Sequence, residues 1–160
     1  MTALVGNAIG RKDDDEANRI ALQGVSFAGL SAMILLVAAF AFAPSLLTLI
    51  STDGAYRDAG LRYMMILILS LPSFVIAYGL NGILQASGDT VSMQRALIGA
   101  FFVNLGLNPV LVFGIPPIFD GFGFNGIAAA TVISQSGVML YIARQVWRCG
   151  LCRRVCFRRG

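Results

Sequence analysis

The stretch that decides the fold covers residues 95–134 and reads RALIGAFFVNLGLNPVLVFGIPPIFDGFGFNGIAAATVIS. Its first part, from Ala96 to Phe119, carries no charge and is long enough to cross a bilayer as a helix. A turn rich in Pro and Gly follows at residues 115–125. A second apolar run then opens with Gly126 and several small residues, which lets another backbone approach closely. The stretch therefore predicts two membrane helices joined by a turn.

Polar groups inside the first of these helices point to a functional site. Asn104 and Asn108 lie four positions apart, hence on one helix face, although membrane helices avoid polar groups that nothing uses. Pro109 cannot donate a backbone hydrogen bond and clashes with the carbonyl of Leu105. We expect two amide oxygens and one freed carbonyl oxygen to gather at mid-membrane depth, as in the interrupted helices of transporters.

Composition places the whole chain in the membrane. The 160 residues are 57% hydrophobic and 12% charged, with a mean hydropathy of +0.76, whereas a soluble domain carries about twice that charged fraction. The absence of histidine excludes histidine metal sites and histidine acid–base catalysis. No acid lies in the apolar spans and Lys12 is the only lysine, so we expect no enzyme. The net charge of +4 does not indicate a nucleic-acid partner, because the placement of the basic residues beside the apolar spans, described below, explains it better.

The hydropathy pattern predicts an all-α integral membrane protein with about four full transmembrane helices. These are expected at about residues 20–50, 63–86, 96–114 and 126–146, and residues 1–10 resemble the end of a further helix whose beginning is missing. Pro44 is expected to turn or stop the first span, and a loop is expected at residues 51–62. Pro72 and Pro109 are expected to kink the second and third spans.

Smaller features define the ends and faces of these helices. Gly24, Ala28 and Gly29 form a small-residue face suited to close helix contact. Gly88 should end the second span, and Asp89 or Thr90 should cap the third.

Three polar clusters each leave two or more interpretations. We interpret the acidic run at residues 13–16 as the start of a helix rather than as a metal or substrate site. We expect the side chains of Asn81 and Gln85 to form hydrogen bonds between helices rather than to contact a ligand. The tail, residues 148–160, combines arginine with Cys149, Cys152 and Cys156. A zinc site, acylation of the cysteines or an arbitrary end outside the fold would each account for it, and we favour the last, with no metal.

Charge asymmetry predicts the orientation. Ten of the twelve Lys and Arg residues flank the spans on the side of loops 11–19 and 87–95 and of the C-terminal tail. The other side has Arg57 and Arg62. By the positive-inside rule, those two loops and the tail are cytoplasmic in a multi-pass protein of the plasma (inner) membrane.

An ordered set of motifs resembles the N-terminal half of multidrug and toxic compound extrusion (MATE) transporters. The set comprises residues 4–10 with the acidic loop, residues 79–90, the Asn104/Asn108–Pro109/Gly114 pattern and the Gly126/Thr131 pattern. The resemblance covers residues 3 to about 147.

The resemblance implies two pseudo-symmetric six-helix lobes, of which this chain holds the end of helix two and helices three to six. It implies that helix one and the second lobe are missing, and we expect the chain to be truncated. It further implies alternating access, with Na⁺ or H⁺ moving inward in exchange for small organic cations. The family's cation site carries over to Asn104, Asn108 and Thr131, and no other cofactor is implied.

Asn108 departs from the family pattern, since many relatives have aspartate there. An amide oxygen can ligate Na⁺ but cannot take up a proton near neutral pH. Proton coupling would then need an acid from another segment, and uncoupled transport is the other option. Two alternative functions stay open: a lipid-linked oligosaccharide flippase of the same superfamily, and a non-transporting structural fragment that is inactive alone. Flippases of that superfamily tend to line their cavity with arginines. In this chain arginines lie only at helix ends, so the flippase is less favoured.

Overall fold

The computed structural model describes residues 2–50, 55–115 and 119–149. Six helices account for most of this part, and a pair of two-residue strands lies between the last two. The elements are α1 (Thr2–Gly10), α2 (Asp14–Ile50), α3 (Ala55–Ile68), α4 (Leu71–Ala86), α5 (Ser92–Phe113), β1 (Gly114–Ile115), β2 (Phe119–Asp120) and α6 (Phe124–Arg148).

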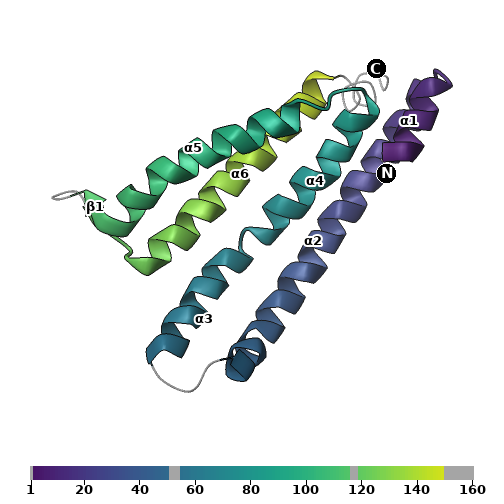
Figure 1. Cartoon of the computed structure of the whole chain (residues 1–160). Helices are drawn as coiled ribbons and strands as arrows, with labels where there is room; N and C mark the ends of the chain where they lie inside the picture. Colours follow the sequence, from purple (N-terminus) through teal and green to yellow (C-terminus); the bar gives the residue numbers. More distant parts are fainter. Residues whose placement is uncertain (1, 51–54, 116–118, 150–160) are drawn as a thin grey trace.

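The helices form two neighbouring layers (Figure 1). In one layer, α5 and α6 run side by side as an antiparallel hairpin, closed by β1 and β2. In the other, α2 packs against both α3 and α4, and α1 packs against α2 and α4. Contacts of α6 with α3 and α4 join the layers, so α6 is the helix that holds α5 in place.

Four helical segments are long and apolar enough to cross a membrane: Asp15–Leu49, Arg57–Ala86, Ser92–Phe113 and Phe124–Arg148. This confirms the expected all-α membrane architecture with four spans. Large apolar side chains such as Phe101 and Phe102 are more than half exposed along these spans. Exposed side chains of this kind suit a surface that faces lipid.

The first span is longer than the sequence predicts. Helix α2 begins at Asp14, so most of the acidic run lies in its first turns, and the backbone N–H of Glu16 is held by Asp13 Oδ1 at 2.9 Å. The helix then continues through Pro44 to Ile50, so the prediction that Pro44 stops the span is wrong. In a membrane, a proline inside a helix is tolerated because neighbouring groups adjust.

The second span is broken rather than merely kinked. A loop is expected from the sequence at residues 51–62, but helix α3 already begins at Ala55. Residues 51–54 lie outside the described residues. The break falls between Ile68 and Leu71 and places Pro72 in the first turn of α4. Proline is favoured there because the first N–H groups of a helix have no internal partner. Ser70 Oγ donates to the carbonyl of Leu67 at 2.7 Å and so satisfies an acceptor at the break.

Small residues set the closest helix contacts. A Cβ atom on Gly79 of α4 would lie 2.9 Å from the Cβ of Ala28 on α2, which confirms the predicted close contact at Ala28. A Cβ atom on Gly126 of α6 would lie 2.4 Å from the backbone oxygen of Leu111 on α5, as expected for a close approach of two backbones. Gly29, in contrast, has no atom within 4 Å of its Cβ position, so it makes no such contact.

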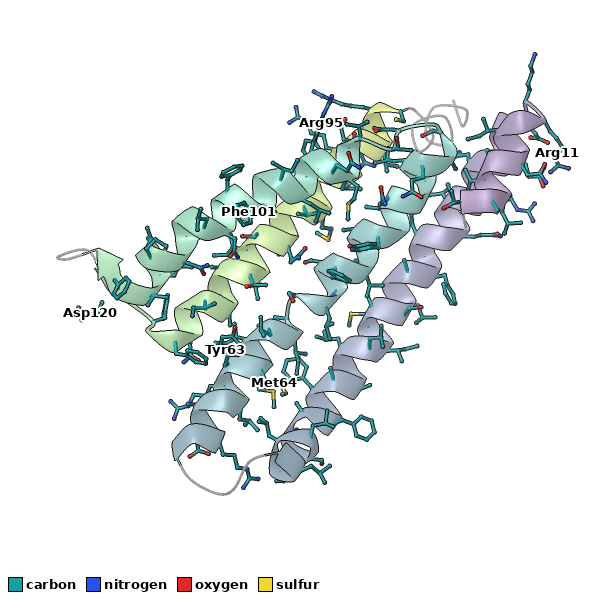
Figure 2. All side chains as sticks on the ribbon, in the orientation of Figure 1. Arg11, Tyr63, Met64, Arg95, Phe101 and Asp120 are labelled. Carbon is teal, nitrogen blue, oxygen red and sulfur yellow. The ribbon has the colours of Figure 1, made fainter. Side chains whose placement is uncertain are left out.

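The end of α5 keeps its backbone acceptors satisfied. Phe122 N–H donates to the carbonyl of Leu111 at 2.8 Å, and Gly123 N–H donates to that of Val112 at 3.2 Å. Unpaired backbone groups are costly in a membrane, so these bonds explain how the chain turns directly from α5 into α6. At the start of α6, Tyr63 of α3 packs on Phe124 with ring centroids 4.6 Å apart (Figure 2).

The turn between α4 and α5 follows the prediction in part. Gly88 has a positive φ of 91° just after α4. The N-cap residue of α5 is Val91, neither Asp89 nor Thr90, but the Asp89 carboxylate accepts the N–H groups of Val91 and Ser92 and the Ser92 hydroxyl hydrogen. These hydrogen bonds, above all that from the Ser92 hydroxyl, hold the pKa of Asp89 below its ordinary value.

Candidate functional site

A chain of hydrogen-bonded polar side chains crosses from α5 to α6. Asn108 Nδ2 donates to Asn104 Oδ1 at 3.0 Å, one helical turn earlier on α5. Asn104 Nδ2 donates to Ser134 Oγ on α6 at 3.4 Å, and that hydroxyl donates to the carbonyl of Ala130 at 2.8 Å. The two predicted asparagines are therefore brought together, and both are half-buried against the neighbouring helix.

Asn108 stands at the open end of this chain. Its Oδ1 atom is buried and has no hydrogen-bond partner among the described residues. A buried acceptor without a donor costs about 1–3 kcal/mol, and a bound ion is one of the ways in which such an atom is satisfied. The free oxygen gives the α5–α6 cluster a vacant acceptor rather than a closed network.

Thr131 lies on the same helix as Ser134, one turn closer to the hairpin end. Its hydroxyl donates to the carbonyl of Ile127 at 3.0 Å, which leaves the hydroxyl lone pairs free to accept or to ligate. The helices run antiparallel, and the contacts Asn104–Ser134 and Leu111–Gly126 fix their register. By that register Thr131 is level with the stretch around Asn108, and its membership of the site stays a prediction.

The backbone oxygen predicted to join them is expected on another face of α5. Leu105 is 58% exposed and Pro109 is also exposed, whereas Asn104 and Asn108 are half-buried. A helix carbonyl points along the axis toward the residue four positions later, so the freed Leu105 oxygen belongs to the outward side of α5. The cluster therefore consists of side-chain oxygens from two helices. Helix α5 continues through Pro109, and the kink there stays a prediction.

Ser134 is the site residue that the sequence alone did not identify. It is buried, with 6% of its surface exposed, and it links the asparagine pair to α6. Its spacing offered a signal, because Thr131 and Ser134 are three positions apart and share a helix face.

The two members of the second polar pair, Asn81 and Gln85, lie on one face of α4 but differ in burial. Asn81 is 7% exposed and its Oδ1 has no partner among the described residues, whereas Gln85 is exposed. Asn81 Oδ1 therefore does not form the hydrogen bond to another helix that the sequence predicts.

The cluster is electrically neutral. Asp and Glu are absent from residues 17–52 and 59–88, and also from 90–119 and 121–160. Within the described ranges no group of three or more His, Cys, Asp or Glu could hold a metal ion. Neutral oxygens can ligate a hard cation but cannot exchange a proton near neutral pH.

Comparison with known proteins agrees with the resemblance seen in the sequence. A family model described as MatE matches residues 1–110, which include both asparagines. Over 139 residues the chain is 27% identical to the probable multidrug resistance protein YoeA of Bacillus subtilis, covering 87% of this chain and 30% of that protein. Over 83 residues it is 30% identical to the chloroplastic protein DETOXIFICATION 44 of Arabidopsis thaliana, covering 52% of this chain and 15% of that protein.

A third relative is the FAD transporter of Shewanella oneidensis, 34% identical in an alignment of 90 residues that covers 52% of this chain and 20% of that protein. No solved structure matches the chain. The chain thus spans less than a third of the length of these curated relatives. Because the family model covers more than half of the 160 residues, the chain belongs to the MatE, or multidrug and toxic compound extrusion, family.

Proposed function

We propose that this chain forms the cation-binding part of a secondary active transporter that exports small organic cations by alternating access. The observation that carries the proposal is the unpartnered Asn108 Oδ1, buried at the end of the polar chain from Ser134. With Thr131 level with it, two side-chain oxygens are free to ligate an ion between α5 and α6. Other family segments supply the opposite lobe against which this one moves.

The chemistry of the cluster favours Na⁺ over H⁺ as the coupling ion. Amide and hydroxyl oxygens are suitable ligands for a hard cation, and neither can take up a proton near neutral pH. Proton coupling would therefore depend on an acid outside this chain's spans.

The substrate is proposed to be a cation, in keeping with the multidrug resistance name of one relative. Another relative is named a FAD transporter, and FAD is an anion. The middles of the four spans carry no Lys or Arg, so this part of the protein offers no positive charge to an anion. The same absence weighs against a lipid-linked oligosaccharide flippase. The site also lacks a nucleophile paired with a base, and no enzyme activity is proposed.

A structural role is the second candidate, because one observation favours it. The bond from Asn104 to Ser134 joins α5 to α6, and such bonds between membrane helices contribute about 0.6 kcal/mol each. A purely structural network would bind no ion, which distinguishes the two candidates.

The chain is proposed to lie in the plasma membrane with loops 11–19 and 87–95 and the tail in the cytoplasm. Figure 2 shows Arg11 and Arg95 at the same end of the bundle and Asp120 at the opposite end, which supports a common side for the two basic loops. The tail from residue 150 onward lies outside the described residues.

The function is tested by dye export from cells that make the complete transporter carrying this lobe. We expect lower accumulation of a fluorescent organic cation than in cells without it, and weaker export in Asn104→Leu and Thr131→Val. The control is Ser136→Ala, because Ser136 contacts Ser73 of α4 and not the cluster. Export that is unchanged in both site variants would contradict the assignment of the site.

A further inference from the structure

A groove of about 400 Å³ lies along the α5–α6 pair, and neither Asn104 nor Asn108 is among the residues that line it. Its walls come from Gly99 and Val103 of α5 and from Ile133 and Gly137 of α6. No atom lies within 4 Å of the Cβ position at either glycine, so the space above both is open. In a bilayer, an open apolar groove of this kind is occupied by hydrocarbon or by another helix.

The groove and the cation site are neighbouring surfaces, and Ala100 of the groove lies four positions before Asn104 on α5. Residues 99 and 104 of α5 are five positions apart, as are 103 and 108, which turns them about 140° around the helix axis. Gly99 and Val103 are exposed, whereas Asn104 and Asn108 are half-buried. Ser134 belongs to both, because it lines the groove wall and accepts from Asn104.

The groove has one polar end. Arg95 and Tyr141 line it there, and since the helices run antiparallel they lie at the same level. Gln145 Nε2 donates to the Tyr141 hydroxyl oxygen at 2.9 Å, so the hydroxyl hydrogen remains available to a further acceptor. This end therefore presents a guanidinium and a hydroxyl donor above an apolar channel about 12 Å long.

Arg95 is also available to a ligand. Its nearest acidic neighbour in sequence, Asp89, attracts it electrostatically but accepts its hydrogen bonds from the N–H groups of Val91 and Ser92 and from the Ser92 hydroxyl. Among the described residues Arg95 forms no ion pair within 4 Å, in contrast to Arg11, which pairs with Glu16 at 2.7 Å.

We propose that the groove binds one anionic phospholipid, with its phosphate held by Arg95 and Tyr141 and an acyl chain lying over Gly99 and Gly137. Charge complementarity decides for this occupant over a second protein helix. An apolar helix would bring side chains to the glycines but no partner for the guanidinium and hydroxyl, whereas a phospholipid carries an anionic phosphate and an acyl chain in one molecule.

The test measures which lipids the intact chain retains. The protein is reconstituted in phosphatidylcholine vesicles containing a minority of phosphatidylglycerol, released in mild detergent and examined by native mass spectrometry. Wild type is expected to retain one phosphatidylglycerol, preferred over phosphatidylcholine by about fivefold, the factor expected from one arginine near the membrane surface. Arg95→Gln should bring that preference close to parity.

Three comparisons make the result specific. Arg19→Gln removes a cation from α2, away from the groove, and should leave the preference unchanged. The pair Gly99→Leu with Gly137→Leu fills the channel, and it should lose the retained lipid although Arg95 is intact. Circular dichroism and thermal unfolding show whether this pair is folded; if it is not, Gly137→Val alone replaces it, with the same loss expected. Excess free glycerol phosphate, which lacks acyl chains, should displace nothing.

Four results of these retention experiments would each overturn the proposal. These are equal retention of both lipids by wild type, equal effects of Arg95→Gln and Arg19→Gln, retention by the folded groove-filled variant, and displacement by glycerol phosphate. The last would identify a phosphate site instead of a lipid site. A photoreactive group at position 137 that couples to protein rather than to lipid would assign the groove to a helix and would equally overturn it.

Discussion

Replacing Gly126 by alanine should separate the two helices that build the site. The added Cβ would lie 2.4 Å from the Leu111 oxygen, 2.6 Å from its carbonyl carbon and 2.9 Å from Val112 N, all of them backbone atoms that cannot rotate away. Ordinary contact needs about 1 Å more, so α5 and α6 must move apart. Overpacking of this kind costs about 1–3 kcal/mol.

The shift should also reach the polar cluster. The Asn104–Ser134 bond is already 3.4 Å long, so a displacement of the helices would break it. The assay is equilibrium unfolding of the purified protein in mixed detergents, followed by near-ultraviolet circular dichroism, together with Na⁺ binding. Gly126→Ala should lower both the free energy of unfolding and the Na⁺ affinity.

The matched control is Gly106→Ala on α5. No atom lies within 4 Å of the Cβ position of Gly106, so alanine meets no obstacle there. Alanine is also favoured over glycine in a helix by up to about 1 kcal/mol, so the control should be neutral or slightly more stable. Equal unfolding free energies for Gly126→Ala and wild type would refute the close packing of α5 on α6.

Three further changes have distinct expected outcomes. Asp89→Ala should cost about 1 kcal/mol at neutral pH through loss of the hydrogen bonds that its carboxylate accepts at the start of α5. The pKa of Asp89 is lowered in the folded state, so the stabilisation is present above the ordinary value of 3.8. It is lost as pH falls through the lowered value, and the difference between variant and wild type in unfolding titrations should vanish there. Arg11→Ala should change the unfolding free energy by less than about 1 kcal/mol, because its ion pair with Glu16 is exposed. A larger loss would mean that this pair holds α1 to α2. Asn108→Asp should make Na⁺ binding tighten as pH rises and the new carboxylate loses its proton, whereas binding by wild type should stay constant between about pH 5 and 8. A flat profile in the variant would place residue 108 away from the ion.

The sequence predicted the spans well because lipid imposes a long apolar run on each helix. Their ends were harder to predict. Charged turns at Asp14 and Arg57 continue the helices beyond the apolar core, since helix hydrogen bonding does not stop where hydropathy does. Proline was ambiguous for a related reason. Pro44 is accommodated within α2, whereas Pro72 begins a new helix, and the difference depends on neighbouring contacts rather than on local sequence.

The site was predicted in part. The spacing of Asn104 and Asn108 identified a shared face, and the structure brings the two amides into contact. Ser134 could not be selected, because only the register of α6 against α5 shows which hydroxyl meets Asn104. The Leu105 carbonyl was assigned to the cluster because sequence proximity was taken for a shared face, and one residue of offset turns a helix by about 100°.

Na⁺ binding to the purified chain tests the central claim most directly. The dissociation constant is measured for wild type, Asn108→Leu and Ser136→Ala, the last as a control outside the cluster. We predict saturable binding by wild type and Ser136→Ala, and an affinity about tenfold or more lower in Asn108→Leu, since an interaction with a charged group is worth about 1.5–3 kcal/mol. Binding that is equal in all three proteins, or absent from wild type, would contradict the claim that the free oxygen of Asn108 serves a cation.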